Sequence, residues 1–123
     1  MKRICIIVSI IACALFSSQC GKPDILKQEA KLKIENTSSS NYITGVYYGT
    51  VGPGDKNKID RKIGPGESKT FTINTEDDDV YDIKVTSDFI GFEELIIDHY
   101  DFMWNETYII ELENDGWYED SSW

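Results

Sequence analysis

The strongest constraint on the fold is an alternation of apolar and polar side chains that begins near residue 32. Leu32 and Ile34 alternate with Lys31, Lys33 and Glu35, the two-residue period of a strand with one buried face. No helical stripe of useful length follows residue 31. Similar alternation, or a β-branched and aromatic composition, recurs at 42–51, 70–73, 81–86, 94–100 and 108–113. The pattern predicts an all-β domain.

Turn-forming sequences separate these segments. The stretch 36–41 is rich in Asn and Ser, and Gly52-Pro53-Gly54-Asp55 and Gly64-Pro65-Gly66 place Pro and Gly where tight turns need them. The segment 58–63 is a candidate seventh strand. Short strands with frequent turns favour an antiparallel β-sandwich of about seven strands, although the sequence alone does not separate a sandwich from a barrel.

The first residues have the composition of an export signal. Met1-Lys2-Arg3 is basic, and Ile4–Phe16 is a run of thirteen residues in which Ser9 is the one polar member. A bilayer-spanning helix needs about 20 apolar residues, whereas the apolar region of a signal peptide has roughly 7–15. We therefore expect the chain to be exported from the cytoplasm.

All three cysteines precede residue 21, so the domain after them has neither a disulfide framework nor a cysteine metal site. A cysteine just beyond an apolar segment resembles the lipobox of bacterial lipoproteins. Cys20 follows an apolar region of normal length, although Ser17 departs from the pattern. Cys13 matches the pattern better but leaves a short apolar region. We favour Cys20 as the lipidated residue, with Cys13 and a plain secreted protein as alternatives.

The expected organisation has four parts. They are a lipoprotein signal peptide (1–19), a lipidated cysteine and tether (20–31), a β-sandwich (32–114) and an acidic aromatic tail (115–123). This predicts a protein of the bacterial cell envelope, held by N-terminal acyl chains in the inner or the outer membrane.

Acidic residues are concentrated in the second half of the chain. The sequence has 22 Asp and Glu against 12 Lys and Arg, and residues 76–123 contain sixteen acids with Lys84 as the one base. Like charges repel, which argues against nucleic acid as a partner. A segregated negative field can attract a basic partner protein.

The stretch 33–114 also resembles small immunoglobulin-like domains of bacterial exported lipoproteins of unknown function. The matching segments are 34–38 (IENTS), 46–48 (VYY), 63–68 (IGPGES) with Phe71, and 81–85 (YDIKV). The resemblance implies an immunoglobulin-like sandwich and an envelope location, and it brings no catalytic residues. The chain departs from it at 75–79, where a tight turn containing glycine is expected.

Two groups of residues are candidates for binding. Asp77, Asp78 and Asp79, with Asp82 nearby, could supply oxygen ligands to calcium, but the spacing of an EF-hand is missing and a solvated loop is the simpler interpretation. Trp117, Tyr118 and Trp123 place aromatic side chains in an acidic tail, where they could anchor a protein partner or cover a sheet edge.

No group of residues indicates catalysis. His99 is the one histidine, and no serine or cysteine is evident as its nucleophile. We therefore expect no enzyme and no required cofactor, but a membrane-anchored module that binds a protein or has a structural role. The alternatives are a calcium-dependent carbohydrate-binding or adhesion domain, and an immunity-type lipoprotein whose acidic surface blocks a basic toxin.

Overall fold

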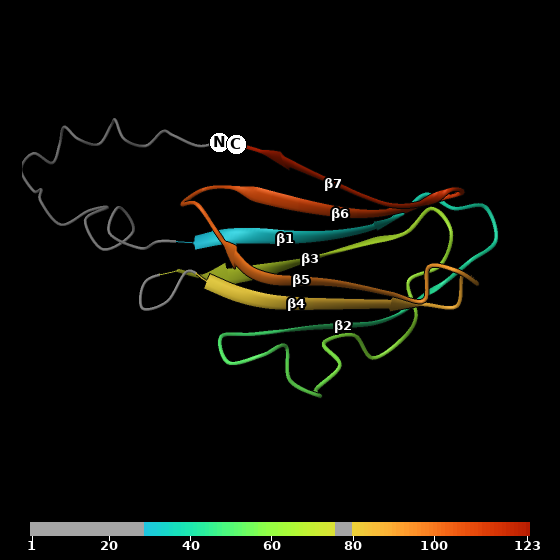
Figure 1. Ribbon diagram of the computed structural model, residues 1–123. Helices are drawn as coiled ribbons and strands as arrows, with labels where there is room; N and C mark the ends of the chain where they lie inside the picture. The colour runs from blue at the N-terminus through green and yellow to red at the C-terminus, as the bar shows by residue number, and fades with distance from the viewer. Residues whose placement is uncertain (1–28, 76–79) are drawn as a thin grey trace, which may run out of the picture.

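A computed structural model describes residues 29–75 and 80–123, and this part of the chain is built of strands without a helix. The seven strands are β1 (Glu29–Asn36), β2 (Ile43–Gly49), β3 (Ser68–Asn74), β4 (Val80–Ser87), β5 (Glu94–Asp101), β6 (Thr107–Glu113) and β7 (Gly116–Ser122). They form one sheet in the order β3-β1-β6-β7 and a second in the order β2-β4-β5 (Figure 1). The predicted β-sandwich is confirmed. Its strand pairs are antiparallel except β1 and β6, which run parallel.

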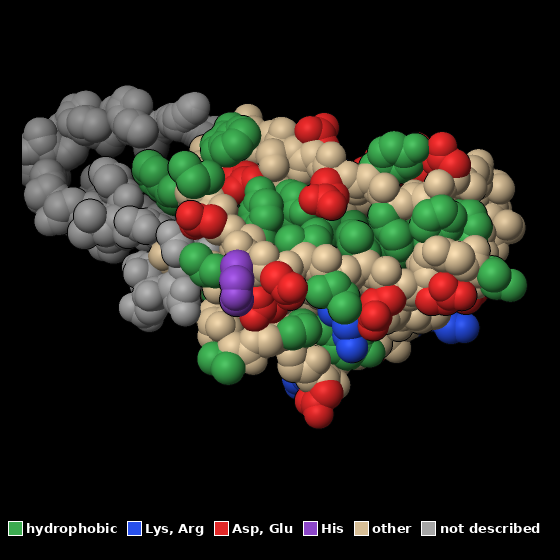
Figure 2. All heavy atoms as spheres, in the orientation of Figure 1, with side chains coloured by type: hydrophobic (Ala, Val, Ile, Leu, Met, Phe, Trp, Pro, Cys, Tyr) green, Lys and Arg blue, Asp and Glu red, His purple; other side chains and the backbone are tan. Residues whose placement is uncertain are grey.

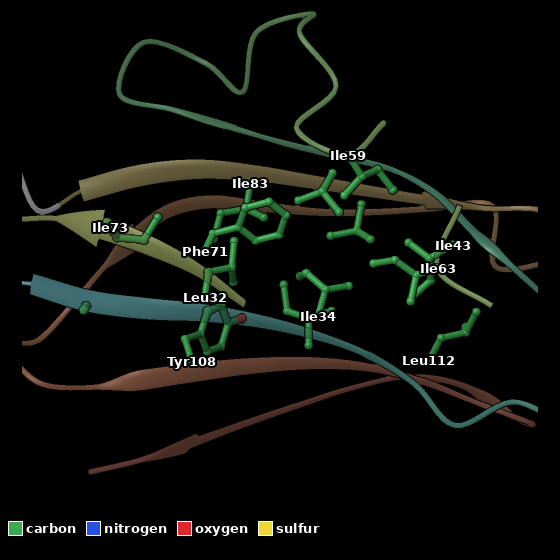
Figure 3. Close-up of a cluster of buried hydrophobic side chains, with 14 of the residues drawn as sticks. Leu32, Ile34, Ile43, Ile59, Ile63, Phe71, Ile73, Ile83, Tyr108 and Leu112 are labelled. Carbon is green, nitrogen blue, oxygen red and sulfur yellow. The ribbon is translucent and has the colours of Figure 1, made fainter. Parts of the chain in front are cut away.

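The alternation seen in the sequence places one face of each sheet in the core. Leu32 and Ile34 of β1 lie beside Tyr108 and Ile110 of β6, and all four are buried. Figure 3 shows side chains from both sheets meeting between the layers. The buried apolar residues are Ala30, Leu32, Ile34, Ile43, Val46, Ile59, Ile63, Phe71, Ile73, Ile83, Val85, Phe102, Tyr108, Ile110 and Leu112. Burial of this apolar surface is the main force that holds the two sheets together.

Three predicted segments differ from the structure. Residues 29–31, assigned from the sequence to the end of the tether, form the start of β1. Residues 116–122, assigned from the sequence to a tail, form β7 and extend the sheet by pairing with β6. The segment 58–63 forms no strand. Its Ile59 and Ile63 are buried while the residues between them are exposed, so the segment lies as a loop over the core with one bridge between Ile63 and Ile43.

The two ends of the sandwich carry different segments (Figure 1). At one end, here called the Glu29 end, the start of β1 lies against the β5–β6 loop, with the backbone N–H of Asn105 donating to the carbonyl of Glu29 at 2.9 Å. The last residue of β7, Ser122, pairs with Thr107 at this same end. The opposite end, here called the Asp115 end, contains the β6–β7 turn and the loop after β1. The chain therefore enters the domain at the Glu29 end.

Candidate functional site

The outer face of the β6–β7 hairpin gathers carboxylates around one tyrosine. Because alternate residues of β6 fill the core, Glu111 and Glu113 point to the other side of the sheet. Tyr118 pairs directly with Glu111, Asp120 pairs with Ile109, and Asp115 lies in the turn between the strands. We call Glu111, Glu113, Asp115, Tyr118 and Asp120 the acidic face.

Hydrogen bonds hold parts of this face in place. The hydroxyl of Tyr118 donates to Asp115 Oδ2 at 2.9 Å, and the hydroxyl of Thr37 donates to Glu111 Oε2 at 2.8 Å. Between the side chains lies a hollow of about 230 Å³, lined by Ile109, Glu111, Glu113, Tyr118, Glu119 and Asp120. The surface thus combines carboxylates with the apolar faces of a tyrosine and an isoleucine.

The surroundings of Glu113 on this face disfavour its charged form. Desolvation, followed by repulsion from Glu111 and Asp115, raises the pKa of Glu113 above its ordinary value. In the described part of the chain, no Lys or Arg forms an ion pair with the acidic face, and the nearby Lys33 is paired with Glu35 at 3.1 Å. A cation from another molecule would therefore relieve repulsion that the domain leaves uncompensated.

The space-filling view shows that acids and apolar side chains are interspersed over one side of the molecule. Asp and Glu side chains are spread across this side, while Lys and Arg lie along its lower margin (Figure 2). On this side of the molecule, the bases therefore lie apart from most of the acids.

The structure separates the three aromatic residues that the sequence placed together. Trp117 and Tyr118 point to opposite faces of β7, since neighbours on a strand alternate. Trp117 is half-buried against the core, and its indole N–H donates to the carbonyl of Phe92 at 3.0 Å. Trp123 lies beyond the other end of β7 and is 72% exposed. Only Tyr118 belongs to the acidic face.

The calcium hypothesis can be followed at Asp82 alone, because Asp77, Asp78 and Asp79 lie outside the described residues. Asp82 is buried, and its Oδ2 accepts the backbone N–H of Gly52 at 2.8 Å. Its Oδ1 accepts the backbone N–H of His99 at 2.8 Å and lies 3.0 Å from His99 Nδ1. These hydrogen bonds hold the pKa of Asp82 below its ordinary value, and the one from the His99 backbone N–H has the largest effect. They also support the bulge of β5, where His99 has a φ of 59°. Both oxygens thus have structural roles.

Among residues 29–75 and 80–123, no group of three or more His, Cys, Asp and Glu side chains is placed to hold a metal ion. The same residues contain no helix of the length and hydropathy needed to span a membrane. The two lipidation candidates, Cys20 and Cys13, lie outside the described residues.

Sequence reasoning missed a buried carboxylate in the β5–β6 loop. Glu106 is 2% exposed, and its Oε1 accepts the backbone N–H of Met103 at 2.8 Å. Its Oε2 accepts the hydroxyl of Tyr100, and that of Ser121 at 2.8 Å. Burial, followed by the bond to Glu106, raises the pKa of Tyr100 to about 12. The cluster links β7 to β5. In the sequence, a glutamate four residues after a buried aromatic residue does not indicate that the glutamate is buried.

Comparisons with known proteins leave the function open. The sequence matches no protein family model, and no curated protein matches it either. Among solved structures, the chain is similar to a protein from Eubacterium rectale determined by NMR, at 16% identity and a TM-score of 0.46. The alignment covers 82% of this chain and 92% of that chain. Similarity at this level contributes nothing to the functional argument.

Proposed function

We propose that the protein is a lipid-anchored, non-enzymatic module of the bacterial cell envelope that binds a basic segment of a partner protein through the acidic face. The observation that carries the binding proposal is the set of carboxylates around Tyr118 that form no ion pair with a Lys or Arg of the described residues. A lysine or arginine side chain fits this surface because its charge meets the carboxylates while its aliphatic stem packs on Tyr118 and Ile109.

Position on the sheet also favours a protein partner. The acidic face lies on the β6–β7 hairpin, and among the described strands β7 is an edge strand with no strand neighbour on its outer side. An extended segment of a partner can hydrogen-bond to such an edge while its basic side chains reach Tyr118 and the carboxylates beside it. Binding through both the edge and the face would distinguish a protein segment from a small cation.

The anchoring proposal depends on the N-terminal sequence. The basic start, the thirteen-residue apolar run and Cys20 support an acyl anchor. Mass spectrometry of the mature N-terminus from the native envelope tests it. We expect a chain that begins at acylated Cys20. Acylation at Cys13 would move the lipidation site from Cys20 to Cys13. An unmodified N-terminus would overturn the proposed acyl anchor.

A charge-neutralising variant tests the binding surface. We expect a fluorescent lysine-rich peptide to bind residues 21–123, and the double change Glu111→Gln/Glu113→Gln to weaken binding about tenfold, since each lost ion pair contributes up to about 1 kcal/mol. The affinity should also fall as salt is raised.

The matched control is Asp55→Asn/Asp60→Asn, which removes the same charge from exposed positions in the β2–β3 loop. It should leave the affinity nearly unchanged. Equal weakening by both double variants would show that the peptide senses net charge alone, and the acidic face would then not be the binding site.

A further inference from the structure

Exposed large apolar side chains gather at the Glu29 end of the sandwich. Met103 and Trp104 in the β5–β6 loop are 55% and 58% exposed, and Trp123, just beyond β7, is 72% exposed. Figure 2 shows hydrophobic side chains grouped at this end. Trp side chains that remain in water at one end of a small domain indicate an interaction surface.

Hydrogen bonds hold the loop in the conformation that exposes these residues. The backbone N–H of Met103 donates to Glu106 Oε1 at 2.8 Å. The backbone N–H of Glu106 donates to the carbonyl of Met103 at 3.1 Å. Asn105 adopts a φ of 67° and donates its N–H to the carbonyl of Glu29 at 2.9 Å. The buried carboxylate of Glu106 therefore fixes a tight turn with Trp104 at its tip.

We propose that Met103, Trp104 and Trp123 form a membrane-contact surface that rests in the headgroup region of the bilayer holding the acyl anchor. The inference rests on the proposed lipidation of Cys20. Nine residue-to-residue steps lead from Cys20 to Glu29, and at about 3.3–3.6 Å per step they reach at most about 32 Å. The anchor thus keeps the Glu29 end near the lipid, and Trp side chains are favoured at the interface between lipid and water.

Charge at the Glu29 end is mixed. The exposed side chains of Asp101 and Lys31 both lie there, and Lys31 lines the same hollow as Trp104. Contact with lipid at this end therefore depends on the exposed tryptophans, and a zwitterionic headgroup layer such as that of phosphatidylcholine or phosphatidylethanolamine meets them without net electrostatic attraction or repulsion. The Asp115 end would then point away from the membrane and present Glu113 and Asp115 to a partner.

The three tryptophans provide an internal comparison. Trp117 belongs to the Asp115 end, because it pairs with Leu112 near the β6–β7 turn. Along β7, Trp117 lies five residues before Ser122. At about 3.3 Å per residue this places Trp117 roughly 17 Å further from the lipid surface. Fluorescence quenching by lipid should therefore affect Trp104 and Trp123 and leave Trp117 bright.

The experiment uses the mature, lipidated protein in phosphatidylcholine vesicles whose acyl chains carry bromine, a quencher of tryptophan fluorescence. We expect the intact protein to float with the vesicles and to lose at least half of its fluorescence relative to vesicles without bromine. The variant Trp104→Phe/Trp123→Phe should float equally and show almost no quenching. Both replaced side chains are exposed, so this variant keeps the core unchanged.

The outcomes separate the two proposals. If the protein floats and its fluorescence is unchanged by bromine, the membrane-contact surface is wrong while the anchor stands. Equal quenching of the intact protein and the double variant would also overturn the surface, because Trp117 would then be the residue near lipid. A lipidation-competent protein that fails to float would overturn the anchor and the surface together.

Discussion

Tyr100 of β5 and Ser121 of β7 donate hydrogen bonds to the same carboxylate oxygen, Oε2 of the buried Glu106. The two strands belong to different sheets, so this shared acceptor fastens the layers together at the Glu29 end. The ring of Tyr100 also stacks on that of Tyr108, with centroids 3.8 Å apart. A polar cluster thus closes the Glu29 end of the core.

Replacing Tyr100 by Phe should lower the free energy of unfolding by about 1.5–3 kcal/mol, the usual contribution of a hydrogen bond to a charged group. The ring and its stacking on Tyr108 are kept, so the change reports the lost donor. Urea unfolding of residues 21–123 measures it. The matched control is Tyr118→Phe, which removes the hydroxyl bonded to Asp115 on the exposed face. That variant should change stability by less than about 0.5 kcal/mol, and equal effects would contradict a special role for Glu106.

The β6–β7 turn depends on Gly116. Its φ of 134° is unfavourable for other residues, and an added Cβ would lie 2.9 Å from the ring of Phe92. Gly116→Ala should therefore destabilise the domain by more than about 2 kcal/mol, combining backbone strain with displacement of an aromatic ring.

The control for Gly116 is Gly54→Ala. Gly54 has a φ of 78°, but a Cβ there meets no atom within 4 Å. This variant should cost about 1 kcal/mol from strain alone. If the two variants unfold at the same urea concentration, the close approach of the new Cβ to Phe92 adds nothing to the loss of stability in Gly116→Ala.

Alkaline pH should weaken the fold through its tyrosines. Burial, followed by the bond to Glu106, raises the pKa of Tyr100 to about 12, and burial, followed by the bond to Glu119, raises the pKa of Tyr108 as well. The unfolded chain ionises these groups near pH 10, so their stabilising effect is complete below about pH 10 and is lost as pH rises through the folded-state pKa. Stability measured by urea unfolding should fall between about pH 10 and pH 12.

The variant Tyr100→Phe separates this effect from general alkaline denaturation. It should show a smaller fall over the same range, because one of the tyrosines with a raised pKa is removed. An unchanged slope would mean that Tyr100 titrates alike in the folded and unfolded chains.

The strands were predictable because their signal is local. Leu32 and Ile34 alternate with charged neighbours, and this pattern alone decides which face of β1 is buried. Strand β7 was missed because its Glu119, Asp120 and two serines have low strand propensity, and it forms through pairing with β6. The turn Asn114-Asp115-Gly116 was the overlooked signal, since Asp-Gly after a strand commonly starts a hairpin.

The candidate site was less predictable because it depends on register. The sequence indicated an acidic second half and singled out Tyr118, but the alignment of Glu111 with Tyr118 across the hairpin follows from the pairing of β6 with β7. The burial of Glu106 depends on contacts between segments distant in sequence. The parallel pairing of β1 with β6 likewise has no local signal.

Photo-crosslinking in living cells tests the central claim, that the acidic face binds a protein, most directly. Tyr118→p-benzoylphenylalanine places the probe on the acidic face, and Thr72→p-benzoylphenylalanine places it on β3, an exposed position of the same sheet at the other edge. We predict that Tyr118 crosslinks to one envelope protein through a basic segment, and that Thr72 does not. Absence of a crosslink at Tyr118, or the same products from both positions, would contradict the account.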